Sequence, residues 1–319
     1  MTKVSLGQAW VSRITKSAYP DISVIGGVAR PLPDAAELKE VLRKLALSDA
    51  AREMVRRKWF QPKSINDKIT ERGEALFDFL FARSGSGGKP ALAMFRGRRV
   101  SIQRDLFEEI STMAWIAHVT DTAQSHPCKV SFKESRISDE FVRRLAKLSV
   151  HDDGPKQALD TLRGIGINVV VESSLPGMSI DGASFHKSGI DPVLAMTLRY
   201  DRLDNFWFTL LHELGHIALH LAEPSDDVFV DSIEDGETDN QEAEAEANAF
   251  AKDGLVPRDT WLRSDARRLG SESSVVSLAK QLGIHPAIVA GRIRYERKEF
   301  RIFNDLVGVG GVRDIIFAN

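Results

Sequence analysis

The sequence has few of the features that mark secreted or membrane proteins. Among its 319 residues only Cys128 is a cysteine, which excludes an internal disulfide. Residues 1–20 lack the basic, apolar and small-residue order of a signal peptide. The apolar segment 206–220 is interrupted by three His and one Glu, well short of the roughly 20 apolar residues that a bilayer span requires. We therefore expect a cytoplasmic protein without a membrane contact.

Nucleotide-binding loops are also absent. Residues 83–90 form a Gly- and Ser-rich linker that has Arg83 and Pro90 at the two ends where a phosphate loop needs Gly and Ser or Thr. What is present is an ordinary globular composition, 43% hydrophobic and 28% charged, with a net charge of -2. The charge is uneven, because residues 1–150 hold 26 Lys and Arg against 17 Asp and Glu, whereas residues 151–319 hold 17 against 28. The basic front half allows a nucleic-acid partner, although a solvated basic surface is the commoner explanation.

One short pattern predicts a metal site. His212, Glu213 and His216 form an HExxH string inside an apolar, proline-free segment for which Asp204 is the expected N-cap. On a helix, residues four apart lie on one face, so both imidazoles can bind one metal ion. Glu213 lies about 100° round the helix from His212 and is left to act as a general base. The pattern predicts a zinc hydrolase.

The third ligand has to come from another segment, because Ala222 stands where a metzincin has its third His. Residues 239–251 predict a helix, expected to end at Gly254 and Pro257. On this helix Glu244 shares its face with small residues that can pack against the metal helix, so Glu244 is the predicted third ligand. Asn248, one turn later, is a candidate to hydrogen-bond a ligand imidazole. Glu242 and Glu246 lie on another face; solvation explains Glu242, and Glu246 is left open.

Two further histidines are weaker candidates. His220 continues the stripe one turn after His216, and it either hydrogen-bonds a backbone group or carboxylate or touches metal or substrate. His186 lies in the turn of a hairpin predicted from segments 178–185 and 192–200, where it either stabilises an oxyanion as a substrate-binding residue or is an exposed loop residue. An edge strand of this hairpin could hold an extended peptide. The acidic segment 223–246 predicts a solvated, mobile loop.

The chain resembles the ImmA/IrrE family of metallopeptidases. The resemblance rests on HELGHIALH at 212–220, EAEANAFA at 244–251 and Leu-Val-Pro at 255–257, and it extends over roughly residues 140–310. One departure is Gly254, where the family usually has leucine. The resemblance implies an α+β, predominantly helical fold: a zincin-like peptidase domain at 141–319 with a small antiparallel sheet and the HExxH helix, after a helical N-terminal domain at 1–140. It also implies an intracellular zinc protein that acts on helix-turn-helix repressors.

The front half predicts helices at 34–58, 66–83 and 104–120. Residues 51–60 are similar to the connector that joins a DNA-binding domain to the peptidase domain in HigA-like antitoxins. A full helix-turn-helix does not fit before this connector, because the preceding residues are broken by Pro20, Pro31 and Pro33. Residues 275–294 also look like a helix-turn-helix. Arg292 stands at a late position of this motif where an apolar residue is expected, so packing in the core is preferred to DNA binding.

Three functions follow as hypotheses. The first is a zinc-dependent endopeptidase that cuts a regulatory protein, a DNA-binding repressor or a toxin or antitoxin partner, with Zn²⁺ on His212, His216 and Glu244. The alternative is an antitoxin-like or transcription-regulatory binding protein whose zinc site is structural or vestigial. The third is a metal-dependent sensor of a small ligand. A purely structural metal does not need Glu213, and this favours the first.

Overall fold

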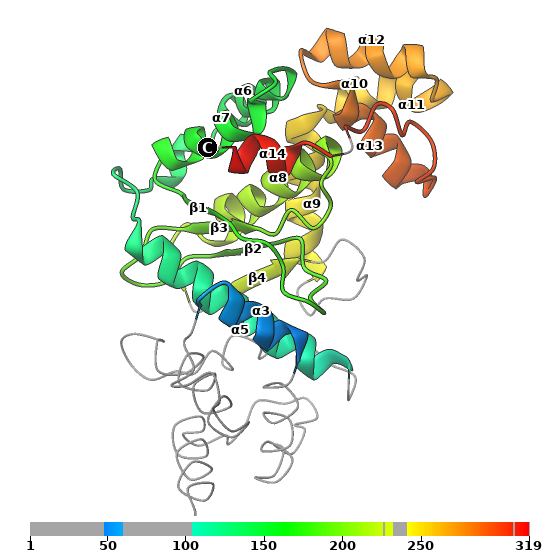
Figure 1. The fold of residues 1–319 in the computed structure, drawn as a ribbon. Helices are drawn as coiled ribbons and strands as arrows, with labels where there is room; N and C mark the ends of the chain where they lie inside the picture. Colours follow the sequence, from blue (N-terminus) through cyan, green and yellow to red (C-terminus); the bar gives the residue numbers. More distant parts are fainter. Residues whose placement is uncertain (1–47, 60–103, 226, 232–240, 309, 319) are drawn as a thin grey trace, which may run out of the picture. The chain divides into compact units, whose positions relative to one another are not determined.

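The computed structural model describes residues 48–59, 104–225, 227–231, 241–308 and 310–318 (Figure 1). Among these, residues 48–59, 104–121 and 175–178 form one compact unit, and 122–174 with 179–318 form another. The expected α+β, predominantly helical class is confirmed. The expected boundary between residues 140 and 141 stays a prediction. Among the described residues, no helix combines the length and the apolarity that crossing a bilayer demands.

The first unit contains a short helix, α3 (Asp49–Arg56), and most of a longer one, α5 (Arg104–Ser125). The Ser48 hydroxyl caps α3 by accepting a hydrogen bond from the Ala51 N–H at 3.1 Å. The Trp59 ring, which follows α3, stacks on His118 of α5 with ring centroids 4.3 Å apart. α3 lies within the helix expected at 34–58, of which residues 34–47 fall outside the described residues, and α5 covers the helix expected at 104–120. The helix expected at 66–83 and the linker at 83–90 lie outside the described residues.

The second unit is built on a four-stranded sheet with the strand order β1-β3-β2-β4. The strands are β1 (Asn168–Val171), β2 (Gly182–Phe185), β3 (Val193–Met196) and β4 (Val228–Asp231). The expected hairpin is confirmed, since β2 pairs antiparallel with β3, Ala183 lying opposite Ala195. β1 pairs parallel with β3, so the sheet is mixed and not purely antiparallel.

The strands at the two edges of the sheet differ from those expected. β2 lies inside, between β3 and β4, so the prediction that the hairpin supplies a peptide-binding edge strand is wrong for β2 and β3. β4 comes from the acidic segment that was expected to be a mobile loop. Its apolar residues Val228, Phe229 and Val230 pair with β2 and bring Phe229 into the core, which the count of acidic residues did not reveal.

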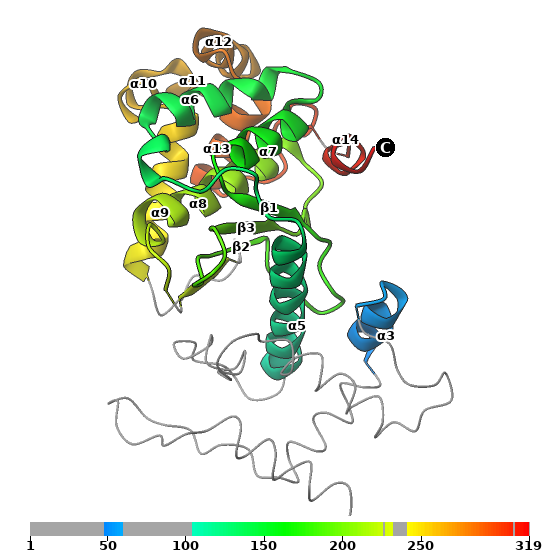
Figure 2. The ribbon, with the colours of Figure 1, turned by 90° about the vertical axis from the view of Figure 1, so that its left-hand side faces the viewer.

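The central helix α8 (Leu203–His220) packs against β2, β3 and the helix α9 (Gln241–Leu255), as Figures 1 and 2 show. The prediction that Asp204 caps α8 is wrong. The helix begins after Arg202, and Asp204 lies buried in its first turn, where both carboxylate oxygens accept hydrogen bonds from the Arg202 guanidinium at 2.8 and 3.0 Å. This pair neutralises a carboxylate that would otherwise be costly to bury.

Glycines bring α8 and α9 close together. A methyl group on Gly215 would lie 3.2 Å from the Ala247 Cα, and one on Gly254 would lie 2.5 Å from Val142 Cγ1. Gly254 was expected to end α9 but lies inside it, where the absence of a side chain makes room for Val142 and Leu211. The expected small face of α9 is therefore confirmed as its packing face, and this fixes Glu244 against α8.

The remaining helices surround this centre. They are η2 (Glu134–Arg136), α6 (Asp139–Lys147), η3 (Leu148–Val150), α7 (Gly154–Gly164), α10 (Arg258–Arg263), α11 (Asp265–Leu269), α12 (Glu272–Leu282), α13 (Pro286–Arg297) and α14 (Val312–Phe317). α12 and α13 are joined by a tight turn in which Gly283 adopts φ 71°. α13 packs against α8, and Arg292 donates hydrogen bonds to the carbonyl oxygens of Lys252 and Val256 at the end of α9. These contacts support the core-packing interpretation of residues 275–294.

Candidate metal centre

Three side chains from α8 and α9 bring their donor atoms together. The Nε2 atoms of His212 and His216 lie 3.0 Å apart. The Glu244 carboxylate oxygen Oε2 lies 3.4 Å from His212 Nε2, and its other oxygen, Oε1, lies 3.6 Å from His216 Nε2. Within the part of the chain that the structure describes, this is the one cluster of three metal-ligating side chains. The structure thus places the three predicted ligands in one group.

The donor set fits a zinc ion. Zinc bonds of about 2.0–2.2 Å in a tetrahedron place neighbouring donor atoms about 3.3–3.6 Å apart, close to the 3.0, 3.4 and 3.6 Å between these three side chains. The two histidine side chains are 3% and 0% exposed, whereas the Glu244 side chain is 16% exposed. The cluster is therefore buried on the α8 side and reached from the side of Glu244.

Aromatic rings hold the two imidazoles in place. Phe229 of β4 stacks on His216 with ring centroids 4.3 Å apart and an angle of 16° between the planes. Phe208, one turn before His212 on α8, lies against the His212 ring at 6.0 Å. Since β4 was not expected from the sequence, the contact of Phe229 with His216 was missed. Val228, Phe229 and Val230 form an apolar run of only three residues between Asp227 and Asp231, which was too short a signal to reveal the strand.

Glu213 lies fully buried on a different side of α8, against the sheet. Its carboxylate oxygen Oε2 lies 2.5 Å from the Ser184 hydroxyl of β2, which also lies 3.0 Å from the Glu213 carbonyl oxygen. At Gly182, two residues before Ser184, an added methyl group would lie 2.2 Å from Oε1 of Glu213. Alternate residues of a strand share a face, so Gly182 and Ser184 together form the surface on which the Glu213 carboxylate rests.

Ser184 and Gly182 were not among the predicted site residues. Both stand in the predicted strand 178–185, and the period of two places them on the same face. That period does not show which face of the strand meets α8. The approach of β2 to Glu213 depends on the packing of the sheet against α8, which no local pattern in the sequence specifies.

His220 and Asn248 lie at the margin of the cluster. The His220 Nε2 atom lies 3.6 Å from Oε2 of Glu246, whose side chain is 54% exposed. This contact matches the interpretation that His220 pairs with a nearby carboxylate, and it gives Glu246 a partner at the surface. Asn248 is half-buried one turn after Glu244. Its hydrogen bond to a ligand imidazole stays a prediction.

His186 is not the exposed loop residue that was expected as its simpler explanation. It is 8% exposed, and its Nδ1 lies 2.8 Å from the Leu221 carbonyl oxygen just after α8. The Phe132 ring contacts His186 edge-on at 6.2 Å. These contacts tie the turn after β2 to the end of the metal helix. A role of His186 in substrate binding stays a prediction.

The comparisons with known proteins agree with this geometry. Residues 165–294 match the model of a peptidase family described as the IrrE N-terminal-like domain, which is the ImmA/IrrE family of the resemblance. The matched range contains all four strands, α8, α9 and nearly all of α13. No curated protein matches the chain. Over this range the chain is similar to metallopeptidase domains of the ImmA/IrrE type.

Proposed function

We propose that this protein is a zinc-dependent endopeptidase in which His212, His216 and Glu244 bind the ion and Glu213 is the general base. The observation that carries the proposal is the convergence of three side chains: the two imidazole Nε2 atoms lie 3.0 Å apart, and each lies 3.4 or 3.6 Å from one of the two Glu244 carboxylate oxygens. A catalytic zinc ion takes three protein ligands and keeps a further position for water or substrate, and three ligands are what α8 and α9 supply.

Each residue has a separate task in hydrolysis. His212, His216 and Glu244 would hold the zinc ion, which would supply a Lewis acid that lowers the pKa of a water and polarises the peptide carbonyl. The Glu213 carboxylate takes the proton of the attacking water and passes it to the leaving amine. The Ser184 hydroxyl, 2.5 Å from Oε2, fixes the rotamer of Glu213 while it does so. Burial of Glu213 keeps bulk water from competing for its proton.

The substrate class follows from the family resemblance. Known members act on helix-turn-helix repressors, so we propose that the substrate is a regulatory protein, such as a DNA-binding repressor or a toxin or antitoxin partner, in the cytoplasm. The uneven charge of the chain offers a reason for selectivity among such proteins. The acidic segment 223–246 leads into the Glu244 helix, and it would favour a basic substrate by long-range attraction, which salt weakens.

The test incubates the zinc-loaded full chain with the purified proteins encoded beside its gene and compares it with Glu213→Gln. We expect wild type to cleave one of these proteins and the variant to bind the same amount of zinc with hydrolysis reduced by about 10²–10⁴-fold, the usual share of a general base. Full activity of Glu213→Gln would remove Glu213 from the mechanism. Zinc binding without cleavage by wild type would instead favour the binding-protein alternative.

A further inference from the structure

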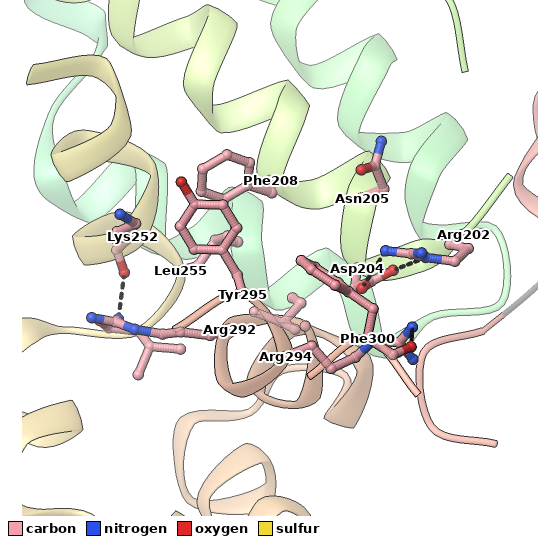
Figure 3. Close-up of a pocket in the computed structure, with 13 residues that line it drawn as sticks. Arg202, Asp204, Asn205, Phe208, Lys252, Leu255, Arg292, Arg294, Tyr295 and Phe300 are labelled. Carbon is pink, nitrogen blue, oxygen red and sulfur yellow. Dashed lines mark hydrogen bonds and ion pairs between the residues drawn. The ribbon is translucent and has the colours of Figure 1, made fainter. Parts of the chain in front are cut away.

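An apolar cleft, open to solvent, lies between α8, the end of α9 and α13 (Figure 3). Its apolar walls come from all three helices, with Phe208 on α8, Leu255 on α9 and Tyr295 on α13. Phe300, which follows α13, is 53% exposed and also lines the cleft. An exposed aromatic side chain beside an apolar cleft is typical of a binding site.

The guanidinium and carboxylate groups of the cleft are already paired, and the Lys252 Nζ lies over the Tyr295 ring, 5.1 Å from its centroid. Arg202 forms two hydrogen bonds with Asp204. Arg292 donates hydrogen bonds to the carbonyl oxygens of Lys252 and Val256. It also forms an ion pair with Glu296 at 3.0 Å. Arg294 donates to the Ile302 carbonyl oxygen and to Asn304. Because these guanidinium groups are occupied within the protein, the cleft offers a ligand mainly its apolar surface.

Phe208 links the cleft to the metal centre, because it lines the cleft and its ring also lies near that of His212. This residue precedes His212 by one turn on the same face of α8, and the two rings are 6.0 Å apart. The Phe208 ring also stacks on Tyr295, with centroids 6.4 Å apart and an angle of 25° between the planes. One helical turn rises about 5.4 Å, whereas an extended peptide advances about 3.3 Å per residue. A peptide with its scissile bond at the metal centre therefore brings a side chain one or two residues away to the cleft.

We propose that this cleft is a specificity pocket that receives a large apolar side chain, aromatic or leucine-like, of the protein substrate within two residues of the scissile bond. The proposal rests on the endopeptidase function proposed above. Phe208 serves both sites, since one side of its ring faces a predicted zinc ligand and the other faces the pocket. The class of substrate is thereby narrowed to proteins that present a large apolar residue on an extended segment near the scissile bond.

The first test measures kcat/KM of the zinc-loaded full chain on peptides that differ only in one residue beside the scissile bond: Phe, Leu, Ala or Asp. We expect Phe or Leu to exceed Ala by at least about 10-fold, because an apolar pocket discriminates by about 10–200-fold for each methylene group. Tyr295→Ala, which removes one wall, should reduce that advantage to less than about 3-fold, with the larger loss on the Phe and Leu peptides. Phe300→Ala should act in the same direction, more weakly.

Phe317→Ala is the matched control for Phe300→Ala. Phe317 lies at the end of α14, is 52% exposed and does not line the cleft. Its replacement should leave the ranking of the peptides unaltered. Cleavage without preference for an apolar residue, or an equal loss on all four peptides in Tyr295→Ala, would overturn the pocket while the endopeptidase function stands.

A second readout does not require hydrolysis. N-acetyl-phenylalaninamide and N-acetyl-glycinamide are each added to the zinc-loaded protein, and contacts with the Phe208 and Tyr295 ring protons are detected by NMR. We expect contacts from the first compound and none from the second, and Tyr295→Ala should abolish them. Contacts without any peptide cleavage would support the pocket and count against the proposed function. Absence of contacts from N-acetyl-phenylalaninamide would overturn the pocket, whether or not peptides are cleaved.

Discussion

Of the three histidine–glutamate contacts that join α8 to α9, two have the same length but lie in different surroundings. His216 and Glu244 approach to 3.6 Å, and so do His220 and Glu246 one turn further along α8. The first pair is joined by a second imidazole, that of His212, 3.0 Å from His216. Its side chains are 0% and 16% exposed, against 17% and 54% in the second pair.

The comparison shows that residue type and spacing do not by themselves make a metal site. A surface pair of this kind contributes about 0–1 kcal/mol to stability, because water and salt screen it. Three donors converging in the interior have lost most of their hydration, and a bound cation restores the missing interactions. One turn of α8 therefore separates a predicted zinc ligand from a surface contact.

The largest expected effect comes from replacing Glu244, with the same replacement of Glu246 as its control. We expect Glu244→Ala to lose more than about 100-fold in zinc affinity, since even residues that only support a ligand are worth about 10–100-fold. Glu246→Ala should keep full zinc affinity and lose less than about 1 kcal/mol of stability. Titration with a competing chelator measures both. Equal zinc affinity of the two variants would show that Glu244 is no more a zinc ligand than Glu246 is.

A second prediction concerns the other side of α8. Gly182→Ala places a methyl group where Oε1 of Glu213 now lies, at 2.2 Å, so the carboxylate has to move. A displacement of about 1 Å can cost about 100-fold in rate, and we expect a fall in kcat/KM of that order. Zinc content should remain at the wild-type level, because the ligands lie on another face of α8. Loss of zinc together with activity would show that the two faces are not independent.

Ser184→Ala tests the same contact more gently. The variant removes one hydrogen bond to the Glu213 carboxylate, and a hydrogen bond to a charged group is worth about 1.5–3 kcal/mol. We expect kcat to fall by at least about 10-fold with KM nearly unchanged, because Ser184 positions the base and does not hold substrate. Ser184→Thr, which keeps the hydroxyl, should recover part of the rate. A rise in KM at constant kcat would place Ser184 in substrate binding instead.

The smallest effect is expected at a histidine that contacts a backbone N–H. His285 caps α13, its Nδ1 accepting a hydrogen bond from the Ala287 N–H at 3.1 Å, and burial lowers the pKa of His285 below 6.5. The neutral ring is the acceptor, so the cap is fully present above pH 6.5 and is lost as the pH falls through the lowered pKa. His285→Ala should cost about 1 kcal/mol at pH 7.5 and less at pH 5 in urea unfolding. An equal cost at both pH values would exclude this titration.

The sequence predicted the helical part of the metal centre well because the relevant distances are local. The spacing of His212 and His216 determines their common face, and the small face of the second helix singled out Glu244 from its neighbouring glutamates. Both follow from the period of one helix. Gly254 shows the limit, since its place inside α9 depends on Val142 of α6.

The parts that the sequence did not reveal depend on which partner a side chain or strand finds, either nearby in the chain or in a distant segment. Asp204 has the residue type of an N-cap but is paired with Arg202 inside the first turn. β4 arises where acidic residues predicted a mobile loop, because pairing with β2 outweighs the local charge. His186 stands in a turn and is nevertheless buried against Leu221. In each case the residue type alone does not show which partner it contacts in the folded chain.

The most direct measurement is zinc anomalous diffraction from crystals of the full chain grown with zinc. We predict one strong peak within bonding distance, about 2.0–2.2 Å, of the Nε2 atoms of His212 and His216 and of a Glu244 carboxylate oxygen. We also predict no peak between His220 and Glu246. A map with the zinc at the second pair, or with no zinc between α8 and α9, would contradict the central claim.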